Sequence, residues 1–255
     1  MKIATWNVNS MNVRQAHVIE WLQAHDPDAL ALQEIKQLTE KFPSDALHDI
    51  GYHSIASGQK TYNGVAVVSK SLPTDPVTDF PDFEDPQRRI LASTTGDVRL
   101  INLYVPNGSE VGSEKYEYKL GWLASLRIFL EAELQRHENV VVLGDFNIAP
   151  ADADVYDPEK WGDAILCSPH ERKALNSILD LGLIDVFRKF DQPENTFSWW
   201  DYRAAGYRRN AGLRIDLILA SAAMAARCTA SYVDKEPRAW ERPSDHAPVV
   251  AEFEI

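Results

Sequence analysis

The stretch VVVLGDFN, residues 140–147, decides the fold prediction, because a buried strand runs there directly into polar residues. A continuous apolar run of this length, followed by Gly, is typical of a strand that is covered on both faces. Asp145 and Asn147 follow the run and lie on one face if the chain stays extended. The pattern therefore predicts a polar site at the end of a buried strand.

Other apolar runs also read as strands, and most of them have a polar group at one end. The predicted strands are 2–8, 29–35, 64–69, 98–105, 213–219 and 247–253. In 29–35, a period of two places Glu34 on the same face as Leu30 and Leu32. The polar residues at the other strands are Asn7, Tyr104, Asp216, Asp245 and His246.

Three segments have helical spacing of apolar residues, namely 13–24, 116–136 and 171–181. We expect Ser168 to cap the third helix, with Pro169 as its first residue and Gly182 as its C-terminal cap. No repeat or linker divides the chain, so we predict a single domain over residues 1–255. Strands and helices mix without a strict alternation. We therefore predict an α/β fold, a four-layer α-β-β-α sandwich of two mixed β-sheets flanked by helices.

Composition limits the function classes. The chain has 26 Lys and Arg against 38 Asp and Glu, a net charge of −12, which argues against broad electrostatic binding to nucleic acid. Its hydrophobic fraction of 45% is ordinary for a globular protein. No stretch approaches 18 apolar residues, and the two cysteines are too few for a secreted scaffold. We expect a reduced cytoplasmic protein that does not associate with membranes.

The polar residues at the strand ends become a chemical prediction if these ends meet at one rim of the sandwich. They would form an oxygen-rich site with one imidazole, which suits a hard divalent cation and phosphoryl chemistry rather than a structural zinc ion. The converging set would be Asn7, Glu34, Tyr104, Asp145, Asn147, Asp216, Asp245 and His246. Each member alone has a simpler reading, since a single Asn or Asp at a strand end is usually a turn former.

The order of these motifs resembles the bacterial exonuclease III family of the endonuclease/exonuclease/phosphatase superfamily. The resemblance is carried by TWNVNS from residue 5, LQEIK from 32, YNGVA from 62, NLYVPNG from 102, GDFNI from 144, GLRID from 212 and SDHAPV from 244. It covers residues 2–253. The GDFN and SDH elements occur across the superfamily, whereas FSWWDYR from residue 197 and LRID from 213 are more specific to its DNA-repair branch.

The resemblance implies a sandwich like that of deoxyribonuclease I, with two similar halves, and Mg²⁺- or Mn²⁺-dependent attack of water on a DNA phosphate. It implies that Glu34, Asn7 and Asp245 are metal ligands and that Asp145 orients or deprotonates the water. Asn147 would hold a phosphate oxygen. His246, held by Asp216, would contact the phosphate, and Tyr104 would bond the phosphate or the leaving group. The expected substrate is double-stranded DNA with an abasic site or a 3′ terminus, and the expected state is a monomer.

Residues 199–216 carry a net positive charge, unlike the whole chain, because four arginines stand there against two aspartates. Aromatic residues are interleaved with these arginines. Such a segment suits a strand whose base or sugar is displaced from the stack, although a solvated loop is the simpler reading. The predicted DNA contacts are Arg88, Arg89, Asn107, Trp199, Trp200, Arg203, Arg209 and Arg214. His170 either limits which nucleotide fits the cleft or merely lies in the first turn of a helix.

Three other functions compete with a DNA-repair phosphodiesterase. An inositol-phosphate or sphingolipid phosphodiesterase of the same superfamily is disfavoured by the arginine-aromatic segment and by the lack of an apolar loop for lipid. The cysteine count disfavours a secreted, nonspecific deoxyribonuclease. A DNA-binding protein without catalysis is disfavoured because every expected catalytic position is filled.

Overall fold

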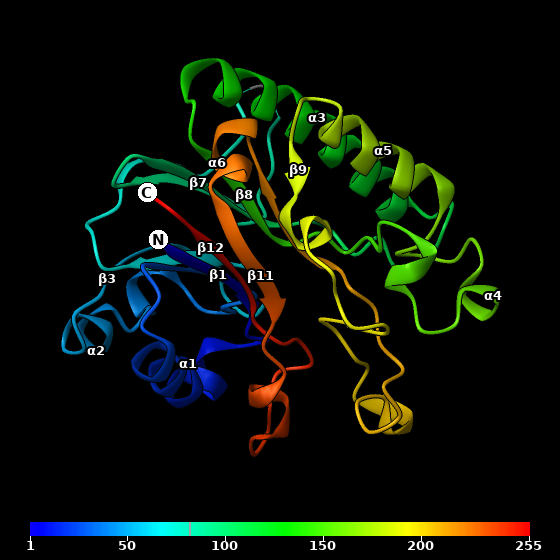
Figure 1. Ribbon diagram of the computed structural model, residues 1–255, viewed down its shortest axis with the longest axis horizontal. Helices are drawn as coiled ribbons and strands as arrows, with labels where there is room; N and C mark the ends of the chain where they lie inside the picture. The colour runs from blue at the N-terminus through cyan, green and yellow to red at the C-terminus, as the bar shows by residue number, and fades with distance from the viewer. Residues whose placement is uncertain (82) are drawn as a thin grey trace.

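Two six-stranded sheets form the centre of the computed structural model, which describes residues 1–81 and 83–255 (Figure 1). The first sheet has the order β11-β12-β1-β2-β4-β3, and the second has the order β5-β6-β7-β8-β10-β9. The strands of the first sheet are β1 (Lys2–Asn7), β2 (Ala29–Gln33), β3 (His53–Ser57), β4 (Val65–Ser69), β11 (Cys228–Val233) and β12 (Val249–Phe253). Those of the second are β5 (Thr74–Val77), β6 (Ile90–Thr95), β7 (Val98–Tyr104), β8 (Val140–Asp145), β9 (Ile184–Asp185) and β10 (Asp216–Ala220).

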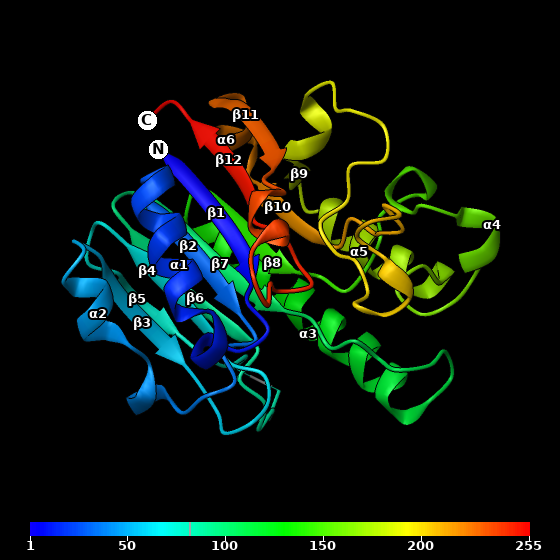
Figure 2. The ribbon, with the colours of Figure 1, turned by 90° about the horizontal axis from the view of Figure 1, so that it is seen from below.

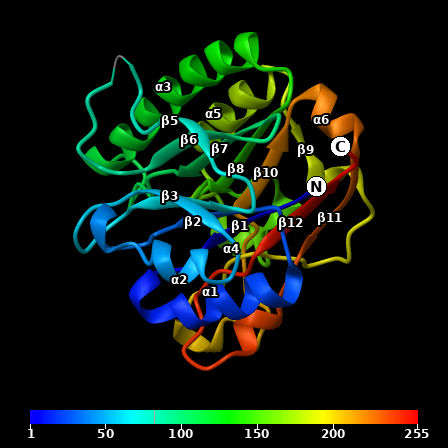
Figure 3. The same cartoon turned by 90° about the vertical axis from the view of Figure 1, so that its left-hand side faces the viewer.

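Helices cover the outer faces of both sheets, so that the molecule has four layers (Figure 3). The first sheet is covered by α1 (Met11–His25) and α2 (Ser44–His48), and the second by α3 (Glu114–Arg136) and α5 (Pro169–Leu179). Shorter helical segments are α4 (Pro158–Trp161), α6 (Ala222–Ala226) and the 3-10 turns Thr39–Lys41, Asp152–Asp154, Val186–Lys189, Arg203–Ala205 and Glu236–Ala239. The predicted four-layer sandwich is confirmed. Among the described residues, no helix combines the length and apolar character needed to cross a bilayer.

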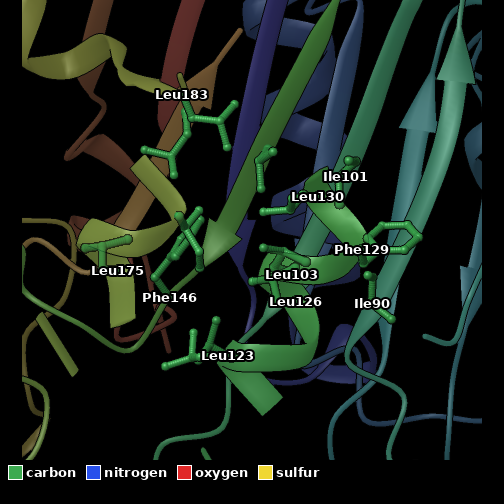
Figure 4. Packing of buried hydrophobic residues seen from close by; sticks show 14 of the residues in the cluster. Ile90, Ile101, Leu103, Leu123, Leu126, Phe129, Leu130, Phe146, Leu175 and Leu183 are labelled. Atoms are coloured by element: carbon green, nitrogen blue, oxygen red, sulfur yellow. The ribbon is translucent and has the colours of Figure 1, made fainter. Parts of the chain in front are cut away.

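Three layers of buried side chains hold the four layers together. Trp6 and Leu30 pack with Trp21 of α1 outside the first sheet. Ile3 and Leu143 lie between the two sheets. Outside the second sheet, leucines of α3 pack on β6, β7 and residues of α5 (Figure 4). Each fully buried Leu or Ile contributes roughly 1.5–3 kcal/mol, so these layers form a rigid frame for the rim of the sandwich.

The topology brings the polar strand ends together. The pairs β1–β2 and β7–β8 are parallel, and α1 and α3 make the respective crossovers between them. The carboxyl ends of all four strands therefore lie at one rim. Tyr104 pairs in register with Asp145, and Asp216, the first residue of antiparallel β10, also pairs with Asp145.

The structure differs from the predictions at several elements. The strand expected over 213–219 begins only at Asp216, because Leu213 instead makes isolated bridges with Val155 and Trp199. Strands β3, β5, β6, β9 and β11 were not predicted, since most are mixed in exposure or very short. The third helix has the expected Ser168 cap and Pro169 start, but it ends at Leu179, so Gly182 lies beyond its cap.

Candidate active site

Three side chains from three different segments meet at this rim. Glu34 follows β2, Asp145 ends β8 and His246 precedes β12, and their ligand atoms all lie within 4.8 Å of one another. Asp145 and His246 are buried, whereas Glu34 is half-buried. These three residues belong to the larger oxygen-rich set with one imidazole that the sequence predicts.

The carboxylate of Glu34 reaches this rim through an unusual backbone conformation. Glu34 has a φ of +50°, a region that costs a non-glycine residue about 1–2 kcal/mol. Leu30 and Leu32 pack on the helix side of the sheet, while Glu34 accepts a hydrogen bond at 2.9 Å from Asn7, which also bonds Asp145 in the second sheet. The prediction that Glu34 shares the face of Leu30 and Leu32 is wrong, because this backbone turn ends the alternation.

Asp145 lies between donors and other acids. Its Oδ1 accepts from the backbone N–H of Asn147 at 2.9 Å, and its Oδ2 accepts from Asn7 Nδ2 at 2.9 Å. Burial, together with the charges of Asp216 and Glu34, raises the pKa of Asp145 to about 7, although His246 and Asn7 oppose the shift. A carboxyl group with a pKa near neutrality is suited to take a proton from water.

His246 lies between the carboxylates of Asp216 and Asp145. Its Nδ1 lies 2.9 Å from Asp216 Oδ2, and its Nε2 lies 3.8 Å from Asp145 Oδ2. Burial lowers the pKa of His246, but the negative charges of Asp216 and Asp145 outweigh burial and raise it to about 10. The two acids therefore favour the cationic imidazole, which would bind a phosphate oxygen more strongly than the neutral ring does.

Two asparagines and a tyrosine complete the rim. Asn107 Nδ2 donates to Asn147 Oδ1 at 3.1 Å, and Asn147 Nδ2 donates to the carbonyl of Val105 at 2.9 Å. Tyr104 has Arg89 over its ring at 4.6 Å. Burial and the nearby charges of Glu34 and Asp145 raise the pKa of Tyr104 well above its usual value, so its hydroxyl stays a proton donor.

Asp245 lies beside the group rather than in it. Its Oδ1 accepts from Asn9 Nδ2 at 2.9 Å and its Oδ2 accepts from Trp199 Nε1 at 3.1 Å. Burial raises the pKa of Asp245, but the charge of His246 and the hydrogen bonds from Asn9 and Trp199 outweigh burial and lower it. Asp245 therefore links the rim to Trp199. The sequence placed Asp245 with Glu34 as a metal ligand, whereas the acid whose oxygen lies close to Glu34 in the structure is Asp145.

The donor atoms fit a hard divalent cation. Carboxylate oxygens of Glu34 and Asp145 converge, and hard cations prefer such oxygens. Asn7 directs its amide Nδ2 at both carboxylates, so the atom that it would offer to an ion is Oδ1, which here accepts from the backbone N–H of Asn9 at 3.0 Å. Lys36, whose Nζ lies 2.8 Å from Glu34 Oε2, is a cationic partner of the same carboxylate. Glu34 and Asn7 are the residues that would hold the ion.

Two cavities flank the group, and several predicted DNA contacts line them. One, of about 310 Å³, lies between residues 156–164 and 199–211, which run on the same side of the molecule (Figure 2), and is lined by Trp199, Arg203 and Arg209. The other, of about 460 Å³, is lined by Arg89, Tyr104 and Asn107. Cationic and aromatic side chains therefore line both cavities, and Trp199 and Tyr104 link them to the catalytic group through Asp245 and Asp145.

The structure corrects two of the predicted DNA contacts. Trp200 is fully buried and donates to Asn210 at 3.0 Å, because alternation turns it inward where Trp199 faces the rim. Arg214 is also buried, and it pairs with Asp154 at 2.6 Å and with Asp185 at 2.7 Å. Both side chains are inaccessible to DNA in this structure.

Two other predicted residues lie away from the catalytic group. Arg88 pairs with Asp79 at 2.9 Å and lines a separate cavity with it. His170 is exposed in the first turn of α5, as the simpler reading expected, and it lines neither flanking cavity.

Residues 4–246 match the model of the Endonuclease/Exonuclease/phosphatase family. The chain belongs to this family. Within the family, it is 38% identical to exodeoxyribonuclease III of Haemophilus influenzae, over 99% of this chain and 100% of that protein. The expected membership in the exonuclease III group is thereby confirmed, and the chain is a DNA-repair nuclease.

Solved structures of the family agree with this assignment. The 3′-5′ exonuclease NExo of Neisseria meningitidis is 53% identical, with a TM-score of 0.98 and full coverage of both chains. An AP endonuclease from Archaeoglobus fulgidus is 41% identical, with a TM-score of 0.96 and full coverage of both chains. A Neisseria 3′ phosphatase bound to a product DNA hairpin is 52% identical, with a TM-score of 0.98 and full coverage of both chains.

The sequence did not single out several residues that line the two cavities. Lys160 and Trp161 line the first cavity, and Tyr62 and Lys115 line the second. Two of them had a signal, because Lys160-Trp161 is a cation-aromatic pair and Tyr62 opens the YNGVA motif. Lys115 had none, since a lysine near a helix start is ordinarily solvent-exposed.

Proposed function

We propose that this nuclease hydrolyses phosphate esters at the 3′ ends of duplex DNA, removing 3′-phosphates, other 3′ blocks and 3′-terminal nucleotides. The observation that carries the proposal is the convergence of Glu34, Asp145 and His246 between two cavities with cationic and aromatic walls. Two structures of Neisseria NExo, one described as a 3′ phosphatase and the other as a 3′-5′ exonuclease, support the choice of 3′ ends. Abasic-site cleavage is the second candidate activity, since an AP endonuclease shares the fold at 41% identity.

Each residue has a role that its contacts support. Asp145, with a pKa of about 7, accepts a proton from the attacking water. Cationic His246 contacts a phosphate oxygen, and Asp216 holds its ring in place. Asn147 and Asn107 donate to other oxygens of the phosphate, and Tyr104 donates to the oxygen that leaves. The P–O bond to the leaving group breaks as the water oxygen bonds phosphorus.

Mg²⁺ is the proposed cofactor, with Mn²⁺ able to substitute. When bound, the ion stabilises negative charge on the phosphate. Glu34 and Asn7 would hold it, and Asp245 remains a candidate further ligand on the rim. Magnesium rather than zinc is favoured because the donors are mostly oxygens and the site contains a single imidazole.

The test uses three duplexes, with a 3′-phosphate, a recessed 3′ end and an internal abasic analogue, each with Mg²⁺ and with EDTA. We expect cleavage with Mg²⁺ alone, fastest on the 3′-phosphate. Asp145→Asn should lower turnover at least 10²-fold, which corresponds to several kcal/mol of barrier. Near-normal turnover of Asp145→Asn, or cleavage in EDTA, would contradict the assigned roles.

His170 carries a finer proposal on specificity. We propose that His170 limits which nucleotide fits the site, although it lines neither flanking cavity, and we expect His170→Ala to raise the ratio of abasic-site cleavage to 3′-phosphate removal. Lys173→Ala on the same helix is the control. An unchanged ratio would leave His170 with no role beyond its place in the helix.

Two expectations about the whole protein also remain proposals. We propose that it acts as a monomer, which light scattering with chromatography tests. We propose a cytoplasmic location, supported by the two cysteines, both of which are free. Fractionation of the source cells tests the location.

A further inference from the structure

A fully buried lysine lies directly behind the two asparagines of the rim. Lys119, in the first part of α3, has no exposed surface. Its Nζ donates to the backbone carbonyl of Asn147 at 2.7 Å and to that of Asn107 at 3.1 Å, and it forms an ion pair with Glu171 of α5. One ammonium group therefore holds the backbone of both asparagines.

These contacts close a ring. Lys119 joins the two backbone carbonyls, and Asn107 Nδ2 joins the two side chains by donating to Asn147 Oδ1 at 3.1 Å. Asn107 and Asn147 follow β7 and β8, which are parallel neighbours in the second sheet. The spacing of the two amides thus depends on the lysine as well as on the sheet.

The backbone at this point needs such support. Asn147 has a φ of +49°, the left-handed region, which is sparsely populated by non-glycine residues. The loop after β7 packs closely on the lysine, since a Cβ on Gly108 would lie 3.1 Å from Lys119 Cδ. Without the lysine, two carbonyls at this point would lose their charged donor.

Fold stability alone is a weak reason for a buried ion pair at this position. The desolvation cost of two buried charges often equals or exceeds their attraction, and apolar pairs are frequently as stable. The carboxylate of Glu171 has hydrogen-bond donors besides the lysine, because it also accepts from the N–H groups of Leu166 and Ser168, each at 3.1 Å. What the lysine adds is a fixed position for the asparagine backbones.

We propose that Lys119 is a positioning residue for phosphate-ester hydrolysis, which sets the amides of Asn107 and Asn147 at the distance that the phosphate requires. This inference rests on the role proposed above for Asn147. Lys119 touches no reacting atom, so its loss acts on turnover through the asparagines. A displacement of about 1 Å at such a group costs roughly 10²-fold in rate.

The test compares two buried ion pairs of the same frame. Lys119→Met/Glu171→Gln removes both charges together, so that neither is left buried alone. The control is Arg99→Met/Glu133→Gln, because Arg99 and Glu133 form a 2.5 Å pair at the far end of β7 and are equally enclosed. With assays well below each melting temperature, we expect kcat on a 3′-phosphate duplex to fall about 10- to 100-fold in the first variant, with KM changed less than about threefold. The control should stay within about threefold in kcat.

Asn147→Ala separates this inference from the proposed function. If Lys119 acts through Asn147, the Lys119→Met/Glu171→Gln change should add little to the kcat loss already present in Asn147→Ala. A full additional loss in that background, or equal kcat values in the two ion-pair variants, would overturn the inference. Normal activity of Asn147→Ala itself would instead overturn the role of Asn147. Lys119→Gln with Glu171 kept is the second variant, and its kcat should be intermediate because an amide can still donate to one carbonyl.

Discussion

The imidazole Nδ1 of His246 lies 2.9 Å from Asp216 Oδ2, and this contact crosses from the first sheet to the second. Asp216 opens β10 and pairs in register with Asp145 of β8, so one short stretch of sheet carries two acids on opposite sides of the ring. The histidine thereby has a fixed orientation and a cationic charge. Both properties depend on Asp216.

Asp216→Asn should therefore lower kcat by roughly 10²-fold, because the amide cannot stabilise the imidazolium and fixes the ring less firmly. The measurement is steady-state hydrolysis of a 3′-phosphate duplex at saturating Mg²⁺. Asp97→Asn, in an exposed turn between β6 and β7, is the control and should be silent. Wild-type turnover in Asp216→Asn would show that His246 does not need this partner.

Removal of Lys36 should strengthen metal binding. Lys36 Nζ lies 2.8 Å from Glu34 Oε2, so its ammonium competes with an incoming cation for the same carboxylate. A half-exposed pair is worth about 0–1 kcal/mol, hence Lys36→Met should lower the Kd for Mn²⁺ by up to about fivefold. Calorimetry on the protein without DNA measures it. Lys70→Met is the control, because Lys70 pairs with Asp26, which precedes β2, whereas Glu34 follows the other end of that strand. A weaker affinity would mean that Lys36 supports the site instead.

The thiols should be inert at neutral pH. Burial raises the pKa of Cys167 to about 11 and also raises that of Cys228, and only the thiolate is nucleophilic. We expect slow alkylation of the folded protein at pH 8 and rapid alkylation of both thiols in denaturant, measured by mass spectrometry. Since the folded pKa of Cys167 exceeds the ordinary value, its contribution to stability is complete below about pH 9 and is lost as the pH rises through about 11. Rapid labelling of the folded protein at pH 8 would contradict this environment.

The central strands of both sheets could be predicted because their sequences are almost wholly apolar. Strands β1, β2, β4, β7 and β8 are buried along nearly their whole length, and such runs have few alternatives. Strands β3 and β11 lie at sheet edges with mixed exposure. Their pairing partners fix them as strands, and a local pattern does not contain that information.

The candidate site likewise contains residues that the sequence predicts and residues that it does not. Asp145 could be predicted because it ends an apolar run, whereas the φ of +50° that turns Glu34 out of its expected face has no sequence signal. Lys119 was missed, since a lysine on an amphipathic helix ordinarily faces solvent. Its burial depends on Glu171, 52 residues away in the chain. Contacts of that range follow from the packing of α3 on α5, which periodicity alone does not specify.

Arg209 and Arg214 should respond to substitution in opposite ways, although both lie in the same arginine-aromatic segment. Arg209 is exposed and lines the cavity beside Trp199. Arg209→Ala should weaken DNA binding with little change in melting temperature. Its plot of log K against log salt concentration should lose about one unit of slope, as expected for one lost phosphate contact.

Arg214→Met should instead unfold the protein more easily, because half-buried Asp185 would lose its cation and buried Asp154 would keep only Arg188. Breaking a buried pair in this way costs about 3–5 kcal/mol, measurable by urea denaturation, while the salt slope of DNA binding should not change. In a chain with a net charge of −12, the cations that can contact phosphate are confined to local patches, so the loss of one contact should be visible in the Arg209 variant. A reduced slope for Arg214→Met, with normal stability, would place that arginine on the DNA after all.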